Sequence, residues 1–200
     1  MTIAIERLTG AALQGALPAL ARLRITVFRD WPYLYDGTLE YEENYLSHFA
    51  AAKGAVIVAA RDGDEIVGGS TGAPLRGHTE EFVPVFEAQG FDPDRIFYFG
   101  ESVLLPEYRG QGIGHGFFDH REAHARACAG AKGPYSEAAF CAVVRPNDHP
   151  LRPAAYRSLD AFWEKRGYRK VEGLVGSYSW KDVDQPSETA KPMQFWMRPL

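Results

Sequence analysis

A glycine-rich stretch between Val103 and Phe118 is the part of the chain whose residue types and spacing indicate chemistry. Glycine occupies every second position from 110 to 116, between an apolar run and a segment with helical spacing. Each glycine inside a helix costs about 1 kcal/mol relative to alanine, so some role must offset that cost. Without side chains in the way, several backbone N–H groups can converge on one anion at the positive end of a helix. With Arg109 beside them, these glycines predict a pyrophosphate-binding turn.

Two common nucleotide motifs do not fit this turn. The dinucleotide motif G-x-G-x-x-G requires a third glycine, and the chain has His115 or Phe117 there when counted from Gly110 or Gly112. The phosphate loop G-x-x-x-x-G-K-[ST] is absent as well, because His115-Gly116-Phe117 stands where lysine and serine would follow. Both nucleotide classes are therefore excluded by residue type.

The segment from Arg109 to Gly114 matches the pattern R/Q-x-x-G-x-G/A, and here the chain resembles the GNAT superfamily of acyl-CoA-dependent N-acetyltransferases. The preceding residues 104–108, Leu-Leu-Pro-Glu-Tyr, are similar to the end of the fourth strand of that family. Residues 162–168, Phe-Trp-Glu-Lys-Arg-Gly-Tyr, are similar to the helix ending "lYekxGF" of the family. The resemblance covers residues 95–200 by motif and residues 1–72 by the order of elements.

The resemblance implies acetyl-CoA as co-substrate, with no metal. In the family, main-chain groups at the end of the central strand meet the pantetheine arm and polarise the thioester carbonyl; here these belong to Ser102, Val103 and Leu104. The residues that would hold the pyrophosphate are Arg109, Gly110, Gln111, Gly112, Ile113, Gly114 and His115. An amine would attack the thioester directly in a ternary complex, which requires a base.

Glu101 is the predicted base, because it lies on the expected central strand beside the segment that would meet the thioester. Burial among Phe97, Phe99 and Val103 would make its carboxylate a useful base near neutral pH. The alternative is a structural acid paired with a neighbouring arginine or backbone amide. Strand alternation predicts that Tyr98 points to the opposite face.

The acid that protonates the leaving thiolate is where the chain departs from the family. Trp163 occupies the position of the usual tyrosine, and an indole N–H is not a comparable proton donor. Tyr156, eleven residues before Gly167, is the candidate replacement. The other alternative is a thiolate that leaves unassisted, since a free thiol has a pKa of only about 8.5.

An aromatic segment before residue 38 is the predicted acceptor site, since the first two helices and their loop form this site in the family. Trp31, Tyr33 and Tyr35 supply rigid rings with polar tips, and Asp30 and Asp36 would attract a cationic amine. We therefore expect a small amine or an amino-acid-like acceptor. The alternative is a packed aromatic loop followed by a solvated acidic helix.

His120 and His124 have the i, i+4 spacing of metal ligands, but Arg121 follows the first histidine where the zinc-protease pattern has glutamate, and no third ligand is evident. Cys141 is most simply a small core residue. Arg145, with Arg152 and Arg157, would either meet a CoA phosphate or lie on a solvated face.

The elements that must position these residues follow from apolar periodicity and turn signals. The pattern predicts an α/β fold with a mixed sheet flanked by helices, and the resemblance implies a sheet of about seven strands whose parallel fourth and fifth strands splay apart. Pro18 is expected to break or kink the first helix. The predicted strands are 2–8, 55–60, 65–69, 95–105, 138–144, 168–180 and 193–197, and the predicted helices are 11–29, 38–52, 79–89, 112–129 and 153–166.

The composition predicts one soluble domain over residues 1–200, with 46% apolar and 24% charged residues. The net charge of −4 argues against a nucleic-acid partner, and no apolar stretch is long enough to span a membrane. An N-terminus without a long apolar run predicts a cytoplasmic protein. The aromatic residues of 82–99 suggest a homodimer.

Taken together, the chain is predicted to be an N-acetyltransferase that moves an acetyl group from acetyl-CoA to the amine of a small-molecule or amino-acid-like acceptor. One alternative is a non-catalytic acyl-CoA-binding module or sensor, favoured by Trp163. Another is a transferase of a longer acyl group.

Overall fold

A seven-stranded sheet forms the centre of the computed structural model, which describes residues 3–200. The strands lie in the order β1-β2-β3-β4-β7-β9-β8, with β4 and β7 parallel and the other neighbours antiparallel. The sheet takes strands from both ends of the described chain. Their bounds are β1 Ala4–Leu8, β2 Val56–Asp62, β3 Glu65–Pro74, β4 Ile96–Leu104, β7 Glu137–Val143, β8 Arg169–Lys181 and β9 Glu188–Pro199.

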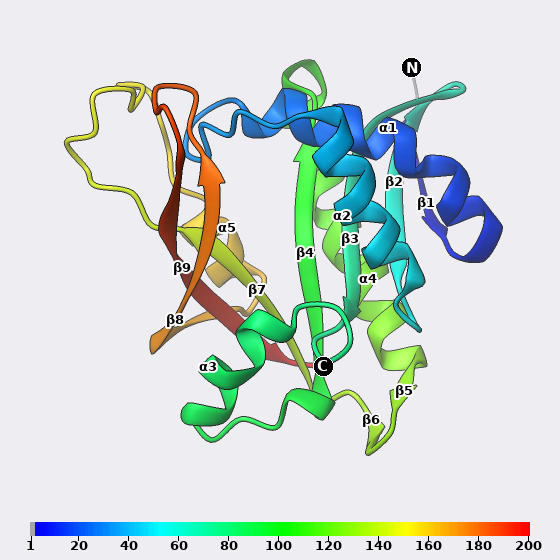
Figure 1. The fold of residues 1–200 in the computed structure, drawn as a ribbon. Coiled ribbons are helices and arrows are strands. Elements are labelled where there is room, and N and C mark those ends of the chain that lie inside the picture. The colour runs from blue at the N-terminus through cyan, green and yellow to red at the C-terminus, as the bar shows by residue number, and fades with distance from the viewer. Residues whose placement is uncertain (1–2) are drawn as a thin grey trace.

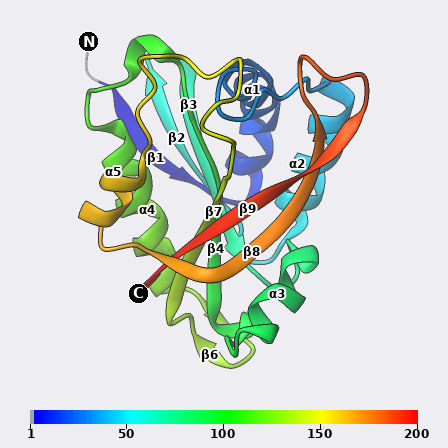
Figure 2. The same cartoon turned by 90° about the vertical axis from the view of Figure 1, so that its left-hand side faces the viewer.

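Helices cover both faces of this sheet (Figure 2). One face carries α1 (Gly10–Phe28) and α2 (Leu39–Ala51), and the other carries α4 (Ile113–Ala127) and α5 (Asp160–Lys165). The smaller elements are α3 (Val83–Ala88), the 3-10 turns Glu80–Phe82, Pro93–Arg95 and Pro106–Tyr108, and a two-residue pair, β5 (Ala129–Gly130) with β6 (Gly133–Pro134). The predicted α/β class and element order are confirmed; residue 2, placed in the first predicted strand, lies outside the described residues.

Two sequence-based expectations are wrong in detail, and a third loses the observation on which it was based. Pro18 does not break α1, because it lies on the exposed face of the helix, where water can satisfy the carbonyl group left without a partner. The helix predicted over 153–166 begins only at Asp160, whose N–H donates to Ser158 Oγ at 3.1 Å. The aromatic side chains behind the homodimer prediction are largely buried, Phe86 and Phe97 completely, so that prediction loses its basis.

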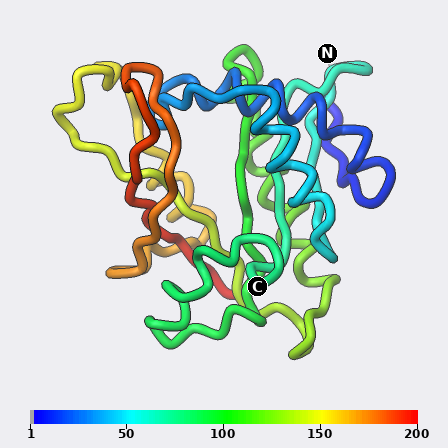
Figure 3. The backbone as a smooth tube through the Cα atoms, viewed as in Figure 1, coloured from blue at the N-terminus to red at the C-terminus, as the bar shows by residue number. Residues whose placement is uncertain are grey.

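The parallel strands β4 and β7 stay paired over a short distance only. Their register runs from Ile96 opposite Glu137 to Tyr98 opposite Ala139. Beyond Tyr98 the two strands diverge, as the ribbon and the tube both show (Figures 1 and 3). The predicted splay of the parallel pair is therefore confirmed.

A β-bulge in β4 lies immediately after the end of this pairing. Phe99 is opposite Gly72 and Ser102 is opposite Ser70, so two residues of β4, Gly100 and Glu101, face one residue of β3. The extra residue shifts the alternation of side chains along the strand. Tyr98 and Glu101 consequently line the same cavity, and the prediction that they point to opposite faces is wrong.

Arg121 of α4 holds the bulge from the other face of the sheet. Its guanidinium donates to the carbonyl oxygens of Thr71 (3.2 Å) and Glu101 (3.3 Å) and to Ser102 Oγ (3.0 Å). The side chain is 1% exposed and stacks on Phe99. Burial lowers the pKa of Arg121 to about 10, so the group keeps its proton at neutral pH. It satisfies carbonyl groups that the irregular ladder leaves free.

The bulge predicts that Gly100 does not tolerate a side chain. A Cβ there would lie 2.5 Å from Thr71 Oγ1, the atom that accepts the N–H of Glu101. We expect Gly100→Ala to lower the free energy of unfolding by about 1–3 kcal/mol, measured by denaturant titration. Gly15→Ala is the matched control: a Cβ on Gly15 in α1 meets nothing within 4 Å, and the change should stabilise by about 0.5–1 kcal/mol. Equal effects of the two substitutions would contradict this account.

Candidate active site

The glycine-rich turn forms the N-terminal end of α4. Gly110 and Gly112 have left-handed φ angles of 77° and 81°, and Gly112 is the N-cap, so no side chain of this residue covers the first N–H groups. Arg109 Nε donates to Leu104 O (3.2 Å), and Gln111 Nε2 donates to Glu107 O (3.2 Å), which ties the exposed turn to the end of β4. The arrangement can present N–H groups and positive charge to an anion.

The main chain of β4 presents two of the three predicted N–H groups to the gap between β4 and β7. Leu105 N–H donates to Val67 O (3.1 Å) on β3. The N–H groups of successive residues in an antiparallel strand point to opposite sides. The N–H of Val103 therefore also faces β3, whereas the N–H groups of Ser102 and Leu104 face the gap toward β7. No pairing with β7 extends to these residues.

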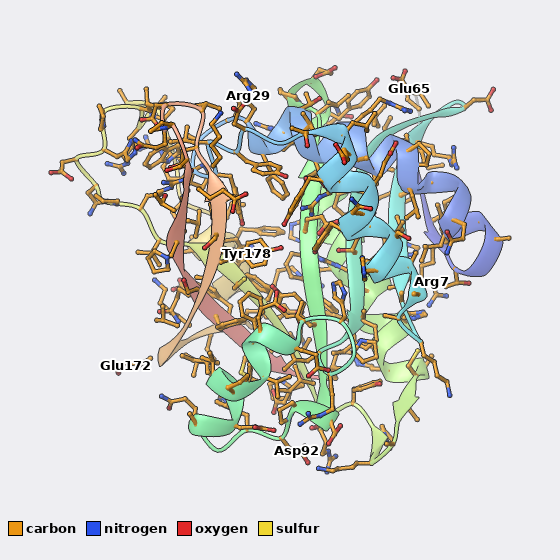
Figure 4. All side chains as sticks on the ribbon, in the orientation of Figure 1. Arg7, Arg29, Glu65, Asp92, Glu172 and Tyr178 are labelled. Carbon is orange, nitrogen blue, oxygen red and sulfur yellow. The ribbon has the colours of Figure 1, made fainter. Side chains whose placement is uncertain are left out.

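A cavity of about 120 Å³ lies where this gap meets the face covered by α1 and α2. Glu101 lines it, as do Tyr33 and Tyr35 of the predicted acceptor segment. Figure 4 shows Tyr178 on β8 directed toward α2, where its hydroxyl lies 3.1 Å from that of Tyr41. Other rings in the wall are Phe28, Tyr45, Phe82, Tyr98 and Trp180.

Three buried charges from three elements meet at the cavity wall. Arg24 of α1 donates through Nε to the Glu42 carboxylate of α2, and its NH1 lies 2.7 Å from Glu101 Oε2 on β4. The carboxylate side chains are 0% and 3% exposed. The Oε1 atoms of Glu42 and Glu101 have no hydrogen-bond partner among residues 3–200. The ion pair required by the structural alternative for Glu101 is present, and so is an unused oxygen that a base requires.

Sequence reasoning missed Arg24 and Glu42, although their positions carried a signal. Arg24 follows Leu20 by four residues, and Glu42 precedes Leu46 by four, so each occupies the buried stripe of its helix. A charged residue on an apolar stripe must find a buried partner. The identity of that partner depends on how the two helices pack.

His78 is a further cavity residue that sequence reasoning missed. Its ring packs edge-on against Phe49 at a centroid distance of 5.2 Å, and Nε2 is buried with no partner among residues 3–200. Burial, with a smaller contribution from the Arg24 charge, lowers the pKa of His78 to about 4. The imidazole is therefore neutral at pH 7.

Cys141 lines the cavity rather than serving only as a core residue. Its Sγ lies 3.0 Å from the Tyr98 hydroxyl, across the last paired residues of β4 and β7. Burial raises the pKa of the Cys141 thiol to about 12. The sulfur is consequently a protonated hydrogen-bonding group and not a thiolate nucleophile.

The predicted acceptor segment is only partly in the cavity. Trp31 does not line it and packs instead against His149 and Tyr156, at centroid distances of 5.1 and 5.9 Å. Asp36 is ion-paired with Arg29 and Lys181, each at 2.8 Å, and hydrogen bonds from Lys181 and Arg29 lower the pKa of Asp36. The Asp36 carboxylate is therefore already compensated.

Arg145 holds the aromatic segment that includes Pro32 and Tyr33. This position fits neither prediction for Arg145, a contact with a CoA phosphate or a place on a solvated face. Its guanidinium forms a bidentate pair with Asp182 (2.7 and 2.9 Å) and donates to the carbonyl oxygens of Pro32 (2.8 Å) and Tyr33 (2.6 Å). With a side chain 9% exposed, it is a buried clamp and not part of a solvated face. It holds the Tyr33 backbone against the turn between β8 and β9.

Trp163, at the position of the usual tyrosine, and Tyr156, the candidate proton donor to the thiolate, lie in different surroundings. Trp163 is packed between Phe140 and Trp196, with centroid distances of 5.0 and 5.2 Å. Tyr156 lies in the loop before α5, outside the set of residues that line the cavity. Burial raises the pKa of Tyr156.

His124, one of the two histidines at metal-ligand spacing on α4, contacts groups other than a metal ligand set. His124 Nε2 lies 2.9 Å from Gly54 O and 3.4 Å from Cys128 Sγ. Within residues 3–200 there is no cluster of three or more histidine, cysteine or acidic residues that could hold a metal ion. Over the same residues, every helix is too short or too polar to cross a membrane.

The depressed pKa of His78 predicts a pH-dependent stability. Between about pH 6.5 and pH 4 the unfolded chain binds a proton that the folded chain does not, so the free energy of unfolding falls as the pH drops through this window. The loss attributable to His78 should be about 3 kcal/mol. We expect His78→Gln to remove it, whereas His48→Gln, on the exposed side of α2, keeps the wild-type profile. Denaturant titration at intervals across the window measures this, and identical profiles for wild type and His78→Gln would refute it.

Comparison with known proteins agrees with this geometry. A ribosomal-protein-alanine N-acetyltransferase from Brucella melitensis is 15% identical, with 98% of this chain and 99% of the other covered and a TM-score of 0.60. Arabidopsis thaliana NAA60 in complex with acetyl-CoA is 12% identical, with coverage of 100% and 99% and a TM-score of 0.57. The PaiA N-acetyltransferase of Thermoplasma acidophilum in complex with coenzyme A is 13% identical, with coverage of 100% of both chains and a TM-score of 0.53. At these identities they show a common fold. A search of curated proteins finds no match.

The family comparison is more specific than the fold. The family model described as the acetyltransferase (GNAT) family matches residues 20–149, which include the Arg24 cluster, the bulge of β4 and the glycine-rich turn. The chain therefore belongs to the GNAT acetyltransferase family.

Proposed function

We propose that this protein transfers an acetyl group from acetyl-CoA to the amine of a small-molecule or amino-acid-like acceptor. One observation carries the proposal: the buried Oε1 atom of Glu101 has no partner among residues 3–200, and Glu101 lines the cavity at the point where β4 leaves β7. A carboxylate placed there can meet both an amine in the cavity and a thioester in the gap.

Acetyl-CoA binding is supported by the turn at the N-terminus of α4. The pyrophosphate would be held by N–H groups from Gly110 to His115 with Arg109 beside them, because the helix end and the arginine both favour an anion. The N–H groups of Ser102 and Leu104 face the gap and are available to the pantetheine arm and the thioester carbonyl. Such donors stabilise the negative charge that develops on the carbonyl oxygen during attack.

In the proposed reaction the amine nitrogen attacks the thioester carbonyl carbon. A proton passes from the nitrogen to Glu101 Oε1, the new C–N bond forms, the C–S bond breaks, and CoA leaves as the thiolate. Oε2 stays paired with Arg24 at 2.7 Å, which holds the carboxylate in place. The position of Tyr156 outside the cavity favours unassisted departure of the thiolate over protonation by this tyrosine.

The second candidate function is an acyl-CoA-binding module without catalysis. It is favoured by Trp163, packed among aromatic rings where the family has a tyrosine, and by the Arg24 ion pair on Glu101. Transfer of a longer acyl group is a further alternative, which propionyl-CoA and butyryl-CoA in the assays below would reveal.

Acetyl-CoA should bind the purified protein with a micromolar Kd in a calorimetric titration, while NAD and ATP should not. Gly112→Ala places a side chain at φ 81°, and we expect it to weaken acetyl-CoA binding about tenfold by straining the turn (1–2 kcal/mol). Gly63→Ala, at φ 59° in the β2–β3 turn with open space around it, imposes similar strain away from the site and should leave the Kd unchanged. Absence of acetyl-CoA binding, or equal effects of the two variants, would contradict the proposed site.

Glu101→Gln should lower kcat by about 10²–10⁴-fold while the Kd for acetyl-CoA stays the same, because the amide keeps the size of the side chain and loses its basicity. The measurement is thiol release with an amine panel, alongside calorimetry. Glu87→Gln, an exposed acid on α3, is the control and should behave as wild type. If the wild-type protein binds acetyl-CoA but acetylates no amine, the binding-module alternative is correct; if Glu101→Gln retains full turnover, Glu101 is not the base.

A further inference from the structure

The charges around the cavity restrict which amine can occupy it. We propose that the acceptor is a compact primary amine with an apolar body and no carboxylate, so that free amino acids and peptides are poor acceptors. The inference rests on the proposed function and makes its acceptor class narrower.

The cavity offers no free cation to a carboxylate. Among the residues of 3–200 that line it, Arg24 is the only arginine or lysine. Its guanidinium is already paired with Glu42 and Glu101. Two carboxylates against one arginine leave a net charge of −1 at the deep wall, and Glu81, exposed at the rim, adds another acid.

The other polar groups around the cavity carry no charge at pH 7 and leave the net charge of its wall negative. His78, from the segment after β3, is neutral at pH 7 because its pKa is lowered to about 4. Tyr33, Tyr35, Tyr45, Tyr98 and Tyr178 all have pKa values raised by burial, and the Cys141 thiol has a pKa of about 12, so all keep their protons.

The cations that neighbour cavity residues along the chain are held in ion pairs outside the lining, and Arg29, next to Phe28, pairs with Asp36 at 2.8 Å. Lys181, next to Trp180, pairs with Asp36 at 2.8 Å. Arg145 and Lys191, whose side chains are 9% and 4% exposed, share the single carboxylate of Asp182. A carboxylate on the acceptor would lose its hydration without meeting an unpaired cation on the cavity lining, which is unfavourable. An ammonium group would gain the unpaired Oε1 of Glu101.

The size and walls of the cavity define the rest of the acceptor. Its volume is about 120 Å³, and a dry cavity of roughly 150 Å³ is enough to hold benzene. The body of the acceptor is therefore about one ring or a short alkyl chain. Rings such as Phe28, Tyr45 and Phe82 supply an apolar wall and faces that attract a cation. A peptide of several residues would have to extend out of the cavity, past the exposed acid Glu81.

Three probes with the same ring separate charge from size: phenethylamine, phenylalanine and phenylalanine amide. With acetyl-CoA saturating, we expect kcat/KM for phenethylamine to exceed that for phenylalanine by at least about 100-fold, as about 2.7 kcal/mol corresponds to two decades. The uncharged amide should recover most of the difference, because it restores the size of phenylalanine without its charge. A tripeptide beginning with phenylalanine should be as poor as phenylalanine itself.

A charge-reversal variant tests whether negative charge at the cavity causes the discrimination against a carboxylate. Glu81→Lys brings a cation to the rim and should shift the ratio of kcat/KM values toward phenylalanine by about tenfold or more, roughly 1.4 kcal/mol. Glu87→Lys makes the same change of net charge on α3, away from the cavity lining, and should leave the ratio unaltered.

The outcomes separate this inference from the proposed function. If acetyl-CoA does not bind, the proposed function fails. If acetyl-CoA binds and phenylalanine or the tripeptide is acetylated as well as phenethylamine, only the charge and size selection is overturned. Calorimetric binding of the three ring probes in the presence of CoA gives the same comparison without turnover, and failure of phenethylamine to bind more tightly than phenylalanine overturns the inference.

Discussion

One extra residue in β4 decides the geometry of the site. Between Phe99 and Ser102 this strand has two residues opposite a single residue of β3, and the shift in alternation directs Glu101 to the face where Tyr98 lies. Arg121 holds the irregular backbone through the carbonyl groups of Thr71 and Glu101. The bulge also follows the last residue pair between β4 and β7. The same short segment thus ends the sheet pairing, leaves backbone N–H groups free and presents a carboxylate to the cavity.

The buried charges near this bulge illustrate a balance between stability and reactivity. Burying an isolated carboxylate is very unfavourable, so Glu42 and Glu101 share the guanidinium of Arg24. Arg24 contacts one oxygen of each carboxylate, and the Oε1 atoms of Glu42 and Glu101 remain without a partner among the described residues. Such unsatisfied groups are uncommon in folded proteins and indicate a function where they line a cavity. The incomplete pairing is what gives Glu101 a free oxygen for an amine.

A second buried cluster shapes the opposite wall. Arg145 joins the carbonyl groups of Pro32 and Tyr33 to Asp182, and Lys191 reaches the same carboxylate at 3.2 Å. Trp180 Nε1 also donates to Tyr33 O, at 2.9 Å. The loop after α1 is therefore held against the β8–β9 turn by charge-assisted hydrogen bonds, and the aromatic side chains near it are placed by this backbone rather than by their own packing alone. A site with rigid walls can select by size and charge.

The sequence by itself determined the elements and the glycine-rich turn, because periodicity, glycine spacing and turn signals are local properties. It also identified Glu101, Tyr33 and Tyr35, which do line one cavity. Only the tertiary structure decided what Glu101 is paired with, on which side of β4 it lies, and that Arg145 is a buried clamp. A bulge depends on the register between two strands, and the partner of a buried charge depends on helix packing. Both arise from contacts between residues far apart in the chain, such as Arg24 with Glu101, and no local pattern encodes them.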